Sequence, residues 1–157
     1  MPAKPTMLDA VKIQARVLVP IAKALEREIG KERAHAILGQ AIADSYAQWQ
    51  GNRTAARDTH PREGNVDHDF PVETEVVEDT DVTFGINMTR CHFAEYFRKI
   101  GEPEVGALLT CGVDFAAQAL LRPSWELQRT QTLMKGASHC DFRWRLRGAK
   151  PPRSDPP

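Results

Sequence analysis

The strand-like segments of this sequence come in two consecutive pairs, and this grouping constrains the fold more than any other feature. Apolar and polar residues alternate over 70–77 and again over 82–89, with a short polar turn between them. A second pair covers 125–135 and 139–147 and turns at Gly136. Alternation with a period of two is typical of a strand with one buried face, and a short turn joins two such strands into a hairpin. The sequence therefore predicts two antiparallel hairpins.

Two amphipathic helices precede the hairpins, over 7–29 and 31–50. Their apolar residues recur at steps of three and four, which is the spacing of one helix face. Thr6 is expected to cap the first helix and Gly30 to end it, while Pro20 is expected to bend it. The short connection at Gly30 predicts that the two helices pack antiparallel.

Two further helices lie between the hairpins, over 91–100 and 102–121. Gly112 inside the longer one weakens a helix by roughly 1 kcal/mol relative to Ala, so we expect a close approach there. The order of elements predicts an α+β domain, in which a four-stranded antiparallel sheet of two hairpins carries helices on one face and follows an N-terminal helical pair. The local pattern does not specify the order of the strands in the sheet.

The chain of 157 residues has the length of a single domain. We expect a helical pair over 8–50, a surface loop over 51–69, an α+β core over 70–147 and a mobile tail over 148–157. The loop has almost no apolar residues, and the tail is rich in proline.

Charge and hydropathy narrow the expected partners and location. The 21 basic residues balance the 21 acidic ones, which gives no reason to expect nucleic acid or an anionic membrane surface as a partner. No stretch of roughly 18 consecutive apolar residues predicts a membrane span, and no signal peptide is apparent. We therefore expect a cytoplasmic protein with reduced thiols and a small-molecule substrate, and we keep a homo-oligomer among the expected assemblies.

Three cysteines occupy three different predicted elements. Cys91 lies at a strand-to-helix corner, Cys111 in the long helix, and Cys140 on the apolar face of the last strand. Asp114 follows Cys111 by about one helical turn, on the same side. We predict that Cys111, Asp114 and Cys140 converge on one pocket between the long helix and the sheet.

The residues alone leave three interpretations of these cysteines open. They fit buried structural thiols, because free cysteine behaves as a small apolar residue. They also fit a catalytic site, with Cys111 as nucleophile and Asp114 as its proton-transfer partner, and with Cys91, Cys140 and His139 as secondary candidates. A metal site would need the three cysteines and a carboxylate, but no CxxC or HxxxH spacing supports it. We therefore expect neither a metal nor a cofactor.

Three arginines are candidates for holding a substrate carboxylate, which a guanidinium binds through paired hydrogen bonds. Arg90 is the first choice, because it ends a strand immediately before Cys91. Arg129 in the third strand is the second. Arg143 lies on the polar face of the last strand, where a solvated charged surface is the simpler interpretation.

Two long stretches, TRCHFAEYFRKIGEPEVGALLTCGVDFAAQALL and LQRTQTLMKGASHCDFRWRL, carry a resemblance. Together they resemble the L-2-amino-thiazoline-4-carboxylic acid hydrolase family. The similarity extends over 8–146, and its most specific parts are Cys91 before an aromatic helix, Cys111-x-x-Asp114 and Gly136-x-x-x-Cys140-Asp141-Phe142.

The resemblance implies a ring-opening hydrolase of a small cyclic amidine-like carboxylate, which would convert the thiazoline to N-carbamoyl-cysteine. This chemistry needs a nucleophile, a proton for the departing atom and a cation for the carboxylate. Cys111 with Asp114 fits the first two needs, and Arg90 or Arg129 the third. Direct attack by water with Asp114 as base fits the chemistry as well, and so does a non-catalytic module that binds or senses a small molecule in the same pocket.

Overall fold

A computed structural model describes residues 5–51, 58–63 and 70–149. Much of the surface loop predicted over 51–69, and most of the tail predicted over 148–157, lie outside the described residues.

The four strands form one antiparallel sheet with the order β1-β2-β4-β3. Each hairpin contributes two neighbouring strands, and the hairpins join where β2 pairs with β4. The strands are β1 (Val72–Asp79), β2 (Thr83–Cys91), β3 (Trp125–Gln128) and β4 (Cys140–Leu146).

The helices match the predicted segments closely. Thr6 caps the first helix, and its hydroxyl accepts the N–H of Asp9 at 3.1 Å; Gly30 ends that helix with a φ of 82°. The long helix over 103–121 is divided by a π-helical turn. The elements are α1 (Met7–Ile29), α2 (Lys31–Gly51), α3 (His92–Lys99), α4 (Pro103–Gly106), the π-helical turn η1 (Ala107–Cys111) and α5 (Val113–Leu121).

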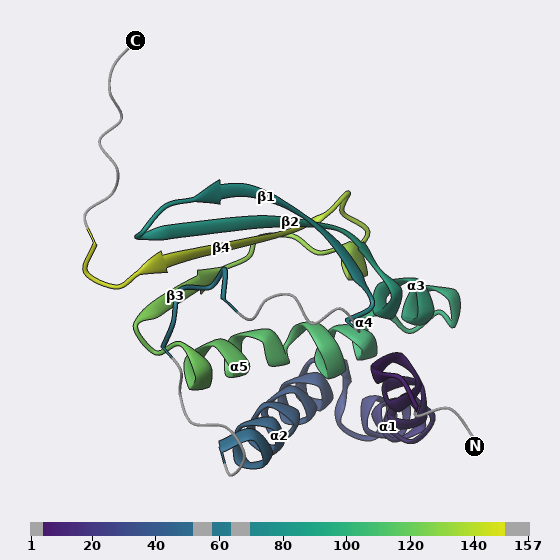
Figure 1. The fold of residues 1–157 in the computed structure, drawn as a ribbon. Coiled ribbons are helices and arrows are strands. Elements are labelled where there is room, and N and C mark those ends of the chain that lie inside the picture. The colour runs from purple at the N-terminus through teal and green to yellow at the C-terminus, as the bar shows by residue number, and fades with distance from the viewer. Residues whose placement is uncertain (1–4, 52–57, 64–69, 150–157) are drawn as a thin grey trace.

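These elements stack in layers (Figure 1). The helices lie on one side of the sheet, with the long helix between the sheet and the α1/α2 pair. The predicted α+β class, with two hairpins, helices on one face and an N-terminal helical pair, is confirmed.

The third strand is shorter than the predicted 125–135. It ends at Gln128, and a 3₁₀ turn (η2, Leu133–Lys135) follows. The reason is that the carboxylate of Asp141 accepts the backbone N–H groups of Thr130 and Gln131 at 2.9 and 2.8 Å. These donors are therefore not available to a sheet ladder, and the chain leaves β4 at this point.

The inner face of the sheet supplies the largest aromatic cluster of the core, with Phe84, Trp125, Phe142 and Trp144 all buried. Buried Gln118 of α5 connects this face to the helix layer. Its amide oxygen accepts the indole N–H of Trp144 at 2.7 Å, and its amide nitrogen donates to the backbone carbonyls of Arg122 and Trp125. The end of α5 is thus held at a fixed distance from the sheet.

The sequence predicts no membrane span, yet the helix over Pro103–Leu121 is long and apolar enough to cross a membrane by length and composition alone. In this fold the same helix packs against α2 on one side and the sheet on the other. Of its apolar stretch, 17% is buried in this fold.

We expect Gly106→Ala to destabilise the fold. A Cβ at Gly106 would lie 2.7 Å from the Cβ of Phe97, which is completely buried. Forcing extra atoms into a packed core costs about 1–3 kcal/mol. Gly39→Ala is the matched control, because its Cβ would lie at an ordinary 3.4 Å from Leu108 and alanine favours a helix by up to about 1 kcal/mol. Urea unfolding measures the stability of both variants, and equal unfolding midpoints for the two would contradict the predicted clash.

Candidate functional site

A cavity of about 250 Å³ lies between the inner face of the sheet and the long helix. Cys91, Cys111 and Cys140 line it together with Asp114 and Arg129, and most of the remaining wall is apolar. We call it the thiol cavity. The prediction that Cys111, Asp114 and Cys140 converge on one pocket between helix and sheet is confirmed.

Cys91 reaches the cavity because of an irregularity in the β1–β2 ladder. The successive β1 residues Glu73 and Thr74 pair with Arg90 and Met88, so that Thr89 is an extra residue on β2. An extra residue reverses the alternation of side chains beyond it. Cys91 consequently shares the cavity side with Met88, and Arg90 falls on the opposite side.

Cys111 is the last residue of the π-helical turn. The N–H of Gly112 donates at 2.8 Å to the carbonyl of Ala107, five residues earlier. The carbonyl of Cys111 accepts a hydrogen bond from Nη2 of Arg129 at 2.9 Å. The turn therefore fixes Cys111 and ties it to the residue that follows β3. Turns of this kind are frequent at functional sites.

Asp114 and Arg129 form an ion pair in the wall of the cavity, through Nη1 of the arginine and Oδ2 of the aspartate. Only 7% of the Arg129 side chain is exposed, against 35% for Asp114. The guanidinium also lies about 5 Å from the ring centres of Phe115 and Phe142, at 5.0 and 5.1 Å. A buried cation is thus compensated by one carboxylate, one carbonyl and two aromatic faces.

Burial raises the pKa of Asp114 to about 6, although the neighbouring Arg129 lowers it. The desolvation of the carboxylate is therefore stronger than its ion pair. Because this pKa is above the ordinary value of 3.8, protonation of Asp114 stabilises the folded state, and that contribution is lost as the pH rises through about 6. A carboxyl group with this pKa exchanges protons readily near neutral pH.

All three thiols are made less acidic by burial. Burial raises the pKa of Cys111 to about 11, while the hydroxyl of Thr110 at 3.7 Å lowers it. It also raises the pKa of Cys91 and of Cys140, against backbone N–H groups that act in the other direction. For Cys140 the donor is Leu133, at 3.3 Å. The resting cavity therefore holds thiols, and any thiolate requires a base.

The structure brings only one of the three candidate arginines to the cavity. Arg129 lines it, whereas Arg90 is half-exposed outside it and forms ion pairs with Glu73 and Glu95. Arg143 lies on the outer face of the sheet and donates to the side-chain oxygen of Asn87.

His139 does not line the thiol cavity, and its ring contacts Gln131 and Ser138 instead. Arg90, Arg143 and His139 therefore lie outside the thiol cavity. Arg90 points away from the cavity because β2 contains an extra residue, which strict alternation of side chains does not predict.

Sequence reasoning did not select Tyr46 or Thr110, which also line the cavity. Thr110 donates from its hydroxyl to the carbonyl of Gly106 at 2.8 Å, one turn earlier in the long helix. Tyr46 comes from α2, which is far from the cysteines in the sequence. No local pattern marks either residue, because their position depends on how the helix layers pack.

Within residues 5–51, 58–63 and 70–149, no group of three or more His, Cys, Asp or Glu side chains is arranged to hold a metal ion. The arrangement offers proton transfer at Asp114, a fixed cation at Arg129 and three neutral thiols around an apolar space.

We expect Arg129→Gln to raise the pKa of Asp114 above its wild-type value of about 6, since the guanidinium favours the ionised carboxylate. A titration of the Asp114 side-chain carboxyl carbon by NMR measures this. Arg90→Gln removes a cation outside the cavity and serves as the control. A wild-type pKa near 3.8 would contradict the dominant effect of burial.

The chain was also compared with known proteins. The family model described as L-2-amino-thiazoline-4-carboxylic acid hydrolase matches residues 10–144. No curated protein matches the chain.

Solved structures also match the chain, at low identity. One is the phenol-responsive sensory domain of the transcription activator PoxR with phenol, with 15% identity, a TM-score of 0.46, and coverage of 83% of this chain and 73% of that one. Another is a trafficking protein particle complex subunit 3 from Naegleria fowleri covalently bound to palmitic acid, with 13% identity, a TM-score of 0.41, and coverage of 87% and 96%.

The family match extends over the helical pair, both hairpins and every cysteine of the thiol cavity. It agrees with the resemblance seen in the sequence. The chain belongs to the L-2-amino-thiazoline-4-carboxylic acid hydrolase family.

Proposed function

We propose that the protein hydrolyses a small cyclic amidine-like carboxylate of the thiazoline type and opens its ring. The observation that carries this proposal is the position of Asp114. Its carboxyl group has a pKa of about 6 and faces an apolar cavity that also holds three thiols and a buried cation. Proton transfer near neutral pH is what the reaction requires.

The reaction adds the oxygen of water to the ring carbon between sulfur and nitrogen. The bond between that carbon and the ring sulfur then breaks, and the sulfur leaves with the bonding electrons and takes up a proton. The product is N-carbamoyl-cysteine, which has a free thiol. The protein must therefore activate a nucleophile at one carbon and deliver a proton to one sulfur.

Arg129 is the residue that we assign to the substrate carboxylate. Its hydrogen bonds to Asp114 and to the carbonyl of Cys111 use two of the five N–H donors of a guanidinium. A substrate carboxylate beside Asp114 would raise the pKa of that residue further, because like charges disfavour ionisation. The higher pKa would make ionised Asp114 a stronger base toward the attacking group, and the proton that it accepts would then pass to the departing sulfur.

Two nucleophiles fit the site. Cys111 lies three residues before Asp114 and lines the same cavity, so its thiol can transfer a proton to the carboxylate and add to the ring carbon. The bond between that carbon and the ring sulfur then breaks, and water displaces Cys111 from the same carbon, which releases N-carbamoyl-cysteine and restores the thiol. Water activated by Asp114 is the alternative. Cys91 and Cys140 line the cavity as well and are the remaining thiol candidates.

The volume of the thiol cavity suits such a substrate. A dry cavity of about 150 Å³ accepts benzene, a six-membered ring without substituents. At about 250 Å³ the thiol cavity has room for a five-membered ring with an amino group and a carboxylate.

A second candidate function is binding or sensing of a small molecule without turnover. The observation that favours it is the protonated state of the three thiols, since burial raises the pKa of each one. Measurement of turnover separates the two functions directly.

We expect the purified protein to convert 2-amino-thiazoline-4-carboxylate to N-carbamoyl-cysteine, detected by mass spectrometry. Cys111→Ala should abolish turnover and remain folded, because removing one partly buried thiol costs about 1–2 kcal/mol of stability. Cys140→Ala removes another cavity thiol and should keep turnover if Cys111 is the nucleophile, whereas loss of turnover in Cys140→Ala alone would assign the attack to Cys140.

Wild-type turnover in a folded Cys111→Ala variant would assign the attack to water or to another thiol. Asp114→Asn should then be inactive. If the wild-type protein binds the ring without opening it, the sensing function replaces the proposed reaction.

We expect the enzyme to prefer the free acid over the corresponding amide, and this preference should disappear in Arg129→Gln. Loss of a contact that is equal in ground and transition states raises KM more than it lowers kcat. Arg90→Gln, outside the cavity, should keep the preference. Steady-state kinetics on the acid and the amide with both variants gives the answer, and a preference that depends on Arg90 would contradict the assignment.

A further inference from the structure

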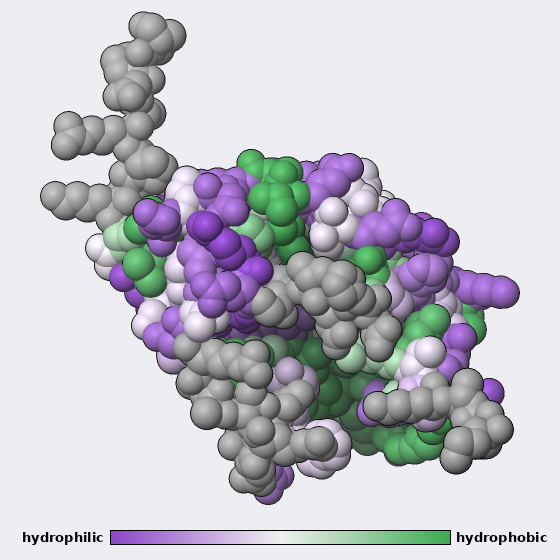
Figure 2. Space-filling model, viewed as in Figure 1, coloured by the Kyte–Doolittle hydropathy of each residue, from purple (hydrophilic) through white to green (hydrophobic). Residues whose placement is uncertain are grey.

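A second cavity of about 400 Å³ adjoins the thiol cavity. The two share part of their walls, including Asp114, Ala117 and Phe142, and so lie side by side along the inner face of the sheet. Figure 2 shows apolar side chains gathered in the hollow between the sheet and the helices. We call the second space the adjoining cavity.

The adjoining cavity offers apolar surface and none of the three thiols. Ile86, Leu127 and Trp144 line it from the sheet, and Leu121 lines it from the end of α5. Polar residues from several elements also line it, and Nη2 of one of them, Arg122, donates to the backbone carbonyl of Glu63 at 2.7 Å. A space of this composition binds an apolar group and does not perform the chemistry itself.

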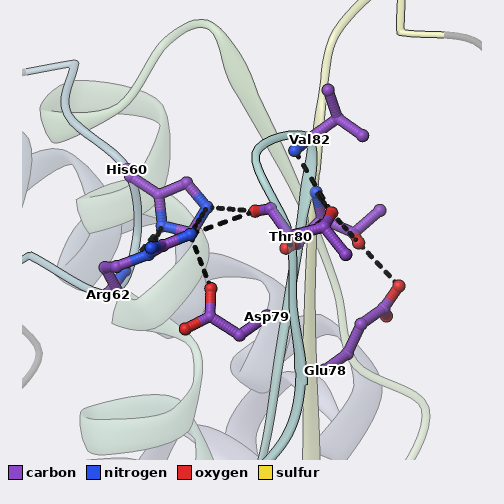
Figure 3. A network of polar contacts seen from close by, with 7 residues as sticks. His60, Arg62, Glu78, Asp79, Thr80 and Val82 are labelled. Carbon is purple, nitrogen blue, oxygen red and sulfur yellow. Dashed lines mark hydrogen bonds and ion pairs between the residues drawn. The ribbon is translucent and has the colours of Figure 1, made fainter.

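Residues 58–63, which contribute Glu63 to this wall, are held firmly against the sheet (Figure 3). The ring of His60 contacts the backbone carbonyl of Thr80 at 2.7 Å, and Arg62 forms an ion pair with Asp79 at 2.7 Å. The His60 ring also makes T-shaped contacts with the rings of buried Phe84 and Trp125. The wall is therefore anchored to both the β1–β2 turn and the aromatic core.

We infer that the substrate carries an alkyl or aryl group that occupies the adjoining cavity, while its ring and carboxylate lie at Asp114 and Arg129. This inference rests on the proposed function for the placement of the ring. Asp114 lines both cavities, so a ring held there has one side toward the thiols and the other toward the apolar space. An unsubstituted thiazoline carboxylate would leave that apolar space unfilled.

Binding of two homologous series tests the inference. The first consists of 2-alkylamino-thiazoline-4-carboxylates from methyl to hexyl, and the second of straight-chain alkyl carboxylates without a ring. Calorimetry gives the dissociation constants. Each added methylene should tighten binding about three- to fourfold, which corresponds to roughly 0.8 kcal/mol. Hydrolysis of the first series is measured separately by mass spectrometry.

Two tryptophan variants test whether the dependence of affinity on chain length arises in the adjoining cavity. Leu121→Trp adds bulk to the wall of the adjoining cavity and should remove the dependence on chain length. Ile100→Trp is the matched control, because Ile100 is 43% exposed at the end of α3 and lines neither cavity. It should keep the wild-type dependence. Thermal unfolding verifies that both variants are folded.

A dependence on chain length in either series that Leu121→Trp removes supports the adjoining cavity as the binding site of an apolar group. Equal affinity along both series, or a dependence that persists in Leu121→Trp, overturns the inference. Absence of ring opening throughout the first series counts against the proposed reaction alone, because the binding measurements do not depend on turnover.

Discussion

The buried guanidinium of Arg129 is the group on which the geometry of this site depends. Its cation is almost entirely removed from water, and a charge in that position must be matched by hydrogen-bond acceptors and by an opposite charge. Asp114 supplies the charge, and the carbonyl of Cys111 supplies a further acceptor. Because these partners belong to the long helix while Arg129 follows β3, satisfying one charge fixes the helix relative to the sheet. The space between them is the thiol cavity.

The π-helical turn is the local means by which the helix meets this requirement. At Gly112 a Cβ would lie 3.2 Å from the carbonyl oxygen of Leu108, so the helix's own backbone makes the close approach that a glycine in mid-helix indicates. The carbonyl of Cys111, the last residue of this turn, accepts a hydrogen bond from Arg129. The same distortion therefore serves both the fold and the position of the thiol.

The sequence predicts the features that depend on local periodicity. It does not predict the places where one extra residue or one polar side chain interrupts that periodicity. Alternation in the last strand predicts the face of Cys140, and helical spacing predicts that Cys111 and Asp114 lie together. The order of the strands is not encoded locally, because any hairpin edge offers the same backbone groups. The end of β3 depends on Asp141, and the side to which Arg90 points depends on the extra residue Thr89.

The charge state of the cavity follows from the balance between Asp114 and Arg129. Below a pH of about 6 the carboxyl group is protonated, the thiols are neutral, and Arg129 alone gives the cavity a net positive charge. Above it the ion pair cancels that charge. An anion that binds at Arg129 disfavours the ionised form of Asp114, so anion binding and proton uptake favour each other.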